Sequence, residues 1–248
     1  MSILRAICLA AILFARAGEV CAQVAIPPAT TLQLAGGKLD LGGTDLQIGG
    51  SVSVGAGNIA NARDISIAAG GALDAGSGTI GLLGNWSGLG NFVAGTSTVN
   101  FIDGGLAQSI ISGATTFYAA SFVSNTGKNY VFPLGLTQTF ANALTILGNA
   151  APIQFRSATP GQVANVNLAF GGTQNIHNIG VSNVHATGQQ LDPTETNQGG
   201  SGDAIGWFGA LAAFVAVPAP LLSPLGLLLL GLVLFGLAHR FRSLLAPK

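Results

Sequence analysis

The stretch LQLAGGKLDLGGTDLQIGGSVSVGAGNIANARDISIAAGGALDAGSGTIGL, residues 32–82, decides the fold of this chain. Apolar–polar–apolar triplets start at residues 32, 39, 46, 52 and 65, and weaker copies start at 59, 73 and 80, so the starts are six to eight residues apart. Alternation with a period of two predicts that each triplet is a three-residue strand with one face inward. Glycine pairs such as Gly36-Gly37 and Gly42-Gly43 separate the triplets, and glycine accepts the positive φ of a tight corner.

The spacing of the triplets predicts how the strands are arranged. The triplets at 32, 52 and 73 lie 20 and 21 residues apart, and those at 39, 59 and 80 do the same. Three strand-and-corner units of this length make one coil, and stacked coils bury a continuous apolar column. We therefore predict an all-β chain that forms a three-faced parallel β-helix, or β-solenoid. The glycine content excludes a coiled coil, and a β-sandwich with short hairpins is the alternative.

From Gly84 the pattern becomes longer and richer in aromatic residues. Strand-like runs are expected at residues 91–94, 97–102, 108–111, 116–123, 130–132, 143–147, 153–156 and 166–170. Most aromatic side chains fall within these runs, and we interpret them as core packing rather than as a sugar platform. They are Phe92, Phe101, Phe117, Tyr118, Phe122, Tyr130, Phe132, Phe140, Phe155 and Phe170. The runs GNWSGLGNFVAGTSTVNF (84–101) and ISGATTFY (111–118) resemble Gly/Asn-rich bacterial surface β-repeat proteins, which implies an exported, non-enzymatic protein over residues 84–208.

The C-terminal end of the sequence predicts a membrane segment. Leu221–Ala238 contains 18 residues without a charge and is followed by His239, Arg240 and Arg242. At about 1.5 Å per residue such a helix measures roughly 27 Å, close to the roughly 30 Å core of a bilayer. The cations after it are expected to hold that end in the cytoplasm. A buried core helix is the alternative, but the segment lacks the polar face that such a helix has.

The order of features in this tail resembles the PEP-CTERM and IPTL-CTERM family of bacterial sorting tails. A proline motif (Val217, Pro218, Ala219, Pro220), the apolar span and the basic pair Arg240 and Arg242 follow one another as they do in that family. The motif differs from both family forms, Pro-Glu-Pro and Ile-Pro-Thr-Leu. The resemblance implies membrane retention and processing by an exosortase-type membrane peptidase, and leaves the cut site open.

The N-terminal residues predict export. Met1–Arg5 is a short cationic segment, and Ala6–Ala15 is an apolar run of the length of a signal-peptide core. Val20-Cys21-Ala22 fits the small-x-small cleavage rule, so signal peptidase is expected to cut between Ala22 and Gln23. An uncleaved signal anchor is the alternative, and a lipoprotein signal at Cys21 is disfavoured by its surroundings.

Charge and motifs exclude several function classes. Between residues 23 and 216 four basic and eight acidic side chains give a net charge of −4, which offers no footprint for nucleic acid. Both cysteines precede residue 22, so no disulfide framework or cysteine chemistry is expected. The histidines His177 and His185 lack a nearby acid cluster. Residues 199–205 resemble one defective copy of a calcium-binding repeat, and we interpret them as polar linker. No catalytic, metal or cofactor site is predicted.

These observations predict four segments: a signal peptide (1–22), a β-solenoid (23–185), a polar linker and pre-membrane segment (186–216) and the sorting tail (217–248). The expected function is that of an exported structural or adhesin-like protein of the cell surface or extracellular matrix. It would be held in the inner membrane as an intermediate, with the membrane, signal peptidase, an exosortase-type peptidase and extracellular polysaccharide as its partners. The alternative is a carbohydrate-active β-helix enzyme, a polysaccharide lyase or glycosidase, which would need clustered carboxylates in a groove.

Overall fold

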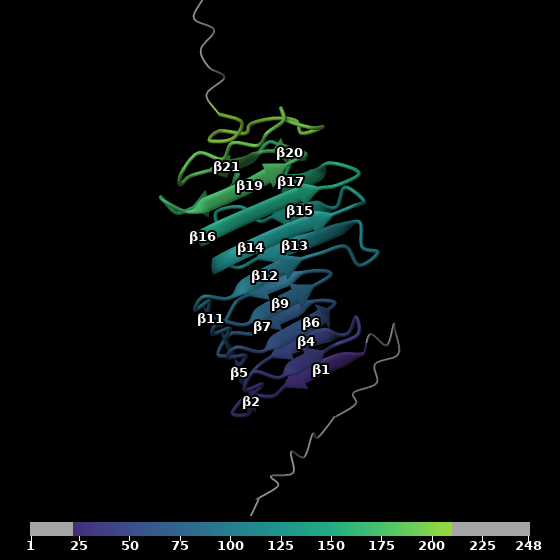
Figure 1. Ribbon diagram of the computed structural model, residues 1–248, viewed down its shortest axis with the longest axis vertical. Helices are drawn as coiled ribbons and strands as arrows, with labels where there is room; N and C mark the ends of the chain where they lie inside the picture. The colour runs from purple at the N-terminus through teal and green to yellow at the C-terminus, as the bar shows by residue number, and fades with distance from the viewer. Residues whose placement is uncertain (1–21, 210–248) are drawn as a thin grey trace, which may run out of the picture. The chain divides into compact units, whose positions relative to one another are not determined.

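The triplets of the sequence stack one above another in the structure, coil on coil. The computed structural model describes residues 22–209, which fall within one compact unit. Strands are its regular elements, and every strand pair is parallel. Figure 1 shows the strands lying in successive layers from β1 to β21. The predicted all-β parallel solenoid is therefore confirmed for this part of the chain.

Three parallel sheets form the sides of the stack, named here sheets A, B and C. Sheet A consists of β1 (Gln23–Ile26), β4 (Asp45–Ile48), β7 (Ile65–Ile67), β10 (Trp86–Gly88), β13 (Gln108–Ser112), β15 (Asn129–Phe132), β17 (Ile153–Ser157) and β20 (Ile179–Ser182). Sheet B consists of β2 (Thr31–Gln33), β5 (Ser51–Ser53), β8 (Ala72–Asp74) and β11 (Asn91–Val93). Sheet C consists of β3 (Lys38–Asp40), β6 (Asn58–Ala62), β9 (Thr79–Leu82), β12 (Thr98–Phe101), β14 (Thr116–Ser124), β16 (Thr137–Gly148), β18 (Ala164–Leu168) and β21 (Val184–Ala186), with β19 (Thr173–His177) also beside β16.

Each of the eight strands of sheet A begins one coil, so the described chain makes eight coils. In the first four coils the register follows the spacing of the triplets. Leu32 pairs with Val52 and Val52 with Leu73 on sheet B. On sheet C, Leu39, Ile59 and Ile80 form the corresponding column. Val52, Leu73, Ile59 and Ile80 are at most 2% exposed, so these columns make the core.

The corner between sheets B and C depends on a column of stacked glycines. Gly55, Gly76 and Gly95 have φ values of 63°, 55° and 55°, in the left-handed region that glycine tolerates. A Cβ atom on Gly76 would lie 2.5 Å from the carbonyl oxygen of Gly55, and one on Gly95 would lie 2.1 Å from that of Gly76. Neither side-chain carbon would fit, because the coils stack here backbone on backbone. The corner glycines therefore set how closely the coils approach.

In the fifth and sixth coils two strands, one of them longer, replace three short ones. Sheet B ends at β11, while β14 and β16 lengthen to 9 and 12 residues. β16 pairs with β18 through its first half and with β19 through its second half, so one strand spans two positions of the coil. The core becomes aromatic: Phe101 and Phe122 stack with ring centroids 4.5 Å apart, and Tyr130 and Phe155 lie edge-on to Phe122.

The predicted core role holds for most of the aromatic residues and fails for two: Phe170, and Tyr118, which is half-exposed beside the buried Phe117 in β14. Phe101, Phe117, Phe122, Tyr130, Phe132, Phe140 and Phe155 are at most 1% exposed. Phe170 was expected in a strand over 166–170, but β18 ends at Leu168 and the Phe170 side chain is 87% exposed. It lies in the turn that Gly172 closes by donating to the carbonyl of Ala169, so the chain leaves the strand before Phe170 can face inward.

The segment after β21 packs against the last coil. A solenoid ending at residue 185 and a polar linker from residue 186 were expected. In the structure Leu191 and Trp207 are 0% and 4% exposed, and they form a parallel bridge. The backbone of Ala186 donates to the carbonyl of Ile205 at 2.9 Å. The packed part of the chain thus continues through residue 209.

Several expectations fall outside the described residues. These are the signal peptide up to residue 21 and the tail with Val217, Pro218, Ala219, Pro220, Arg240 and Arg242. Within the range 22–209 the structure contains no helix with the length and apolar character needed to cross a bilayer.

Candidate functional site

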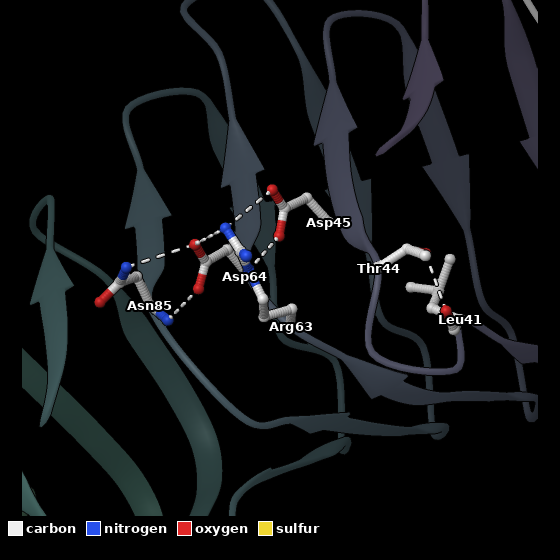
Figure 2. A network of polar contacts seen from close by, with 6 residues as sticks. All are labelled: Leu41, Thr44, Asp45, Arg63, Asp64 and Asn85. Carbon is white, nitrogen blue, oxygen red and sulfur yellow. Dashed lines mark hydrogen bonds and ion pairs between the residues drawn. The ribbon is translucent and has the colours of Figure 1, made fainter. Parts of the chain in front are cut away.

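A ladder of hydrogen-bonded polar side chains follows the corner between sheets C and A (Figure 2). It contains two neighbouring carboxylates, Asp45 and Asp64, as a catalytic acid–base pair would. Arg63 donates from Nε to Oδ1 of Asp45 at 3.0 Å, and its Nη2 lies 3.8 Å from Oδ2 of Asp64. Asp64 also accepts from the backbone N–H of Asn85 at 2.7 Å and from its Nδ2 at 3.3 Å. Asp45, the adjacent pair Arg63 and Asp64, and Asn85 thus link successive coils through their side chains.

The backbone of the preceding turn positions this ladder. The N–H and hydroxyl of Thr44 both donate to the carbonyl of Leu41, at 2.9 and 2.8 Å, which closes the turn just before β4. The carbonyl of Thr44 then accepts from the N–H of Arg63 at 2.9 Å. Asn61 lies two residues before Arg63, at the register shift in β6. Its φ is 55°, a left-handed conformation that asparagine tolerates better than most residues.

A shallow hollow of about 200 Å³ lies beside Asp45 and Asp64 on the outer side of sheet A. Gln23, Leu46, Gln47 and Ser66 line the rest of it. A glycosidase uses one carboxyl group as an acid and a second as a base or nucleophile. Here the Arg63 guanidinium lies between the two carboxylates, and both accept hydrogen bonds from neighbouring coils. The arrangement therefore fits a coil-to-coil ladder better than an acid–base pair.

The ladder continues in the later coils with asparagine in place of charged groups. Asp103 accepts from the N–H of Asn125 at 2.7 Å, and Asn149 donates to the Asn125 side chain at 3.0 Å. Asn178 then donates to the carbonyl of Gly148 at 2.8 Å. The pKa of Asp103 is lowered: burial opposes the shift, but hydrogen bonds from Ser124, Asn125 and Thr126 outweigh it. These groups are engaged in holding the corner.

Lys128 is a buried cation at the same corner. Its Nζ donates to the carbonyls of Leu83 and, at 3.0 Å, Ile102, and it lies 5.5 Å from the centroid of the Tyr130 ring. Burial lowers the pKa of Lys128 to about 8, against the attraction of Asp103 and Asp64. An adjacent hollow of about 320 Å³ is formed by residues 105–107 and 126–129. The ammonium group is directed at backbone carbonyls, which gives it a structural role.

His177 and His185 contact the segment after β21. Nδ1 of His177 lies 2.8 Å from the hydroxyl of Thr194 and 3.8 Å from Glu195, and Nε2 of His185 lies 3.0 Å from Asp203. The backbone N–H of Asn178 donates to Glu195 and lowers the pKa of that carboxyl. Among the residues that the structure describes, no three histidine, cysteine or carboxylate side chains are grouped so that they could hold a metal ion.

Part of the outward face of sheet C, from β9 to β19, is a regular array of small uncharged groups, called here the C face, and a neighbouring column with Val123, Leu147 and His177 borders it. The C face consists of two in-register columns, Thr79, Thr98, Ala119, Ala143, Thr173 and Gly81, Asn100, Ser121, Thr145, Asn175. All ten residues are half-exposed or exposed, while their neighbours Ile80, Val99 and Leu144 face the core. Neighbouring strands lie about 4.8 Å apart, and residues i and i+2 of one strand lie about 6.7 Å apart. The hydroxyl and amide groups therefore form a regular two-dimensional lattice. Such a surface can make many hydrogen bonds to a regular neutral polymer.

Of the sequence-predicted site residues, Gln23 lines the hollow beside Asp45 and Asp64. Ala22 and Gln23 are exposed at the start of the described chain, and Gln23 is the first residue of β1. The motif Val217–Pro220 and the cations Arg240 and Arg242 lie outside the described residues. The corner ladder was not predicted, although Asp45, Asp64 and Asn85 are separated by 19 and 21 residues, about one coil each.

Comparison with known proteins adds no relative. The chain matches no family model, no curated protein and no solved structure.

Proposed function

We propose that this chain is an exported structural or adhesin-like protein of the cell surface or extracellular matrix. In this proposal signal peptidase removes residues 1–22, the tail 217–248 holds the chain in the inner membrane, and an exosortase-type peptidase then processes it at or near Val217–Pro220. Arg240 and Arg242 set the orientation of the tail by the positive-inside bias. The sequence of both ends supports this route.

The C face carries the functional part of the proposal. Its two columns carry no charge over five coils, from Thr79 to Asn175, and seven of their ten residues present hydroxyl or amide side chains. An uncharged surface favours an uncharged partner. A charged polymer would bury its charges against this surface without an opposite charge to pair with them, which is unfavourable. We therefore propose a neutral extracellular polysaccharide as the ligand, bound by many weak contacts repeated along both polymers.

A co-sedimentation experiment tests this ligand. Mature full chain extracted from its host in mild detergent is mixed with insoluble neutral polysaccharides, and the bound fraction is measured. The double variant Thr98→Glu/Thr145→Glu places two carboxylates in the C face and should abolish binding. The matched control Ser51→Glu/Asn91→Glu adds the same charge to sheet B, also two coils apart, and should bind like the unmodified chain. Equal binding by both double variants would exclude the C face as the contact.

The membrane part of the proposal has its own test. A chain that ends at Ala216 lacks the predicted span and should appear in the medium of the native host, while the full chain remains in the cell envelope. An arginine at Leu229, in the centre of the span, should cost about 2.5–3.5 kcal/mol on insertion scales. If the truncated chain stays bound to the inner membrane, the tail is not the anchor.

A carbohydrate-active enzyme is the second candidate, and the hollow beside Asp45 and Asp64 is the observation that favours it. Asp45→Asn and Asp64→Asn should each abolish any polysaccharide cleavage if these carboxylates are catalytic. The structural interpretation expects no cleavage by the unmodified chain, measured as new reducing ends on a panel of polysaccharides. Cleavage that both variants lose would establish the enzyme and displace the structural proposal.

A further inference from the structure

The two ends of the solenoid differ in how they are closed. At the C-terminal end the segment 187–209 covers the last coil: the side chain of Asn197 pairs with both the N–H and the carbonyl of Val181, at 2.8 and 3.0 Å. The N–H of Gln198 donates to the carbonyl of Ile179, and that of Leu191 to the carbonyl of Gly206. At the N-terminal end β1, β2 and β3 are the terminal strands of their sheets, and within residues 22–209 no strand lies on their outer side.

The backbone of the first coil presents unused hydrogen-bonding groups along the axis of the stack. The carbonyls of Ala22 and Ile26 accept from the second coil, so by the alternation of a parallel ladder Gln23 and Ala25 direct their N–H and C=O groups away from it. The bond from Leu34 N–H to the Ser53 carbonyl assigns the same outward direction to Thr31 and Gln33. The corresponding residues of β3 are Lys38 and Asp40. Such a row of free groups is a template for another extended strand.

The apolar columns are also left open at this end. Val24, Leu32 and Leu39 are only partly buried. Their partners one coil further, Leu46, Val52 and Ile59, are at most 2% exposed. A further layer on the first coil would bury these three columns as completely as the rest of the core.

Three features leave this end available to a second copy of the chain. None of the strands β1, β2 and β3 contains proline; Pro27 and Pro28 lie in the turn between β1 and β2. Lys38 and Asp40 are the charged side chains of the first coil and pair with each other at 2.8 Å, so the side chains of this end carry no net charge, and cleavage before Gln23 adds a single amino group. The C-terminal end is covered, which leaves no free edge there for head-to-tail stacking.

We propose that two copies of the exported chain dock through their N-terminal ends, with the edge strands of the first coils pairing across a two-fold axis. This two-fold axis is perpendicular to the solenoid axis, so the two chains wind around the stack in opposite directions. Every strand pair across the interface is therefore antiparallel. The interface is isologous, since the same coil of each copy meets its equivalent. This inference rests on the proposed export, because removal of residues 1–22 makes Gln23, the first residue of β1, the start of the chain.

Single cysteines test the docking, because both native cysteines, Cys8 and Cys21, precede the cleavage site. Ala25→Cys, Thr31→Cys and Lys38→Cys each place one thiol on the outward face of one edge strand. The controls Ser87→Cys, Asn91→Cys and Thr98→Cys occupy the same three columns, three coils further along. Full chain in host membranes is treated with a short bismaleimide cross-linker. We expect a cross-linked dimer from at least one edge variant and none from the control of the same column.

A second variant separates specific docking from random collision. Ala25→Pro removes one outward donor without breaking the ladder to the second coil, so it should reduce cross-linking in the Thr31→Cys background. Mass spectrometry of each band reports whether residues 1–22 are present. Bands that begin at Gln23 but never cross-link at an edge cysteine would overturn the docking alone and leave the proposed function standing. Bands that retain residues 1–22 would contradict the proposed processing instead. Equal cross-linking of edge and control cysteines would also overturn the docking.

Discussion

The first four coils and the last four coils of this solenoid reach a closed core by different means. In β1–β12 the strands are three to five residues long, the core columns are mainly aliphatic, and stacked glycines form a corner. In β13–β21 strands of up to 12 residues replace two short ones, and most of the phenylalanines lie there or at the boundary. The comparison shows two ways to close the same parallel stack: short strands with glycine corners around aliphatic columns, and longer strands around packed aromatic rings.

The aliphatic columns of the first region should be the most sensitive feature. Val52 is 2% exposed and lies between Leu32 and Leu73 in the column of sheet B. Val52→Asp would bury a carboxylate without a partner and should cost more than about 3 kcal/mol of the free energy of unfolding, measured in urea. The neighbouring Ser51 faces outward, so Ser51→Asp should cost less than about 0.5 kcal/mol. Equal losses would mean that the two faces are assigned wrongly.

The aromatic core of the second region should come next. The Phe122 ring contacts Phe101, Tyr130 and Phe155 with centroids 4.5, 4.9 and 5.1 Å away. Phe122→Ala would leave a cavity among these rings and should cost about 3–5 kcal/mol. Phe170→Ala, in an exposed turn of the same region, should change stability by less than about 0.5 kcal/mol. A large cost at Phe170 would contradict its placement outside the core.

A glycine pair isolates the effect of close stacking in the first region. Gly76 and Gly42 have nearly the same φ, 55° and 56°, but only at Gly76 would a Cβ meet the backbone of the coil beneath. Gly42→Ala should cost about 1–2 kcal/mol, the strain of a left-handed residue. Gly76→Ala carries the same strain and also pushes the coils apart, so its melting temperature should be clearly lower. If the two variants melt together, the corner is not close-packed.

The smallest effect is a pH dependence from the second region. The pKa of Lys128 is lowered by burial to about 8, below its usual 10.5, so between these values the unfolded chain binds the extra proton. Stability should therefore rise as pH increases from about 8 toward 10.5, and the penalty should be complete below about pH 8. Lys128→Met removes the titrating group and should abolish this rise, measured by urea unfolding at both pH values. A rise that persists in the variant would assign it to another group.

The sequence was most informative where the coils are most regular. The column Leu39, Ile59, Ile80 follows directly from spacings of 20 and 21 residues, because a three-residue strand and a glycine corner have nearly constant length. Where aromatic residues widen the coil this constancy is lost. The first half of β16 carries no corner signal, and a single strand crossing two positions of the coil was therefore not predicted.

The candidate site was harder to predict than the fold. The outward residues of the C face are an ordinary mixture of Thr, Ser, Asn, Gly and Ala, and only the register places Thr98 beside Thr79. The corner ladder depends on the turn geometry around Asn61 and Arg63, which spacing alone does not encode. Burial of Leu191 and Trp207 was likewise missed, because two apolar residues in a polar segment carry no period.

We propose that the chain is exported, held by its tail and then processed. Mass spectrometry of the intact protein isolated from the envelope and medium of its native host tests that claim most directly, because it reads both ends of the chain at once. The account predicts a chain that begins at Gln23 and has lost the span Leu221–Ala238 in its released form. A single species that still carries Met1 and Lys248 in every fraction would contradict it.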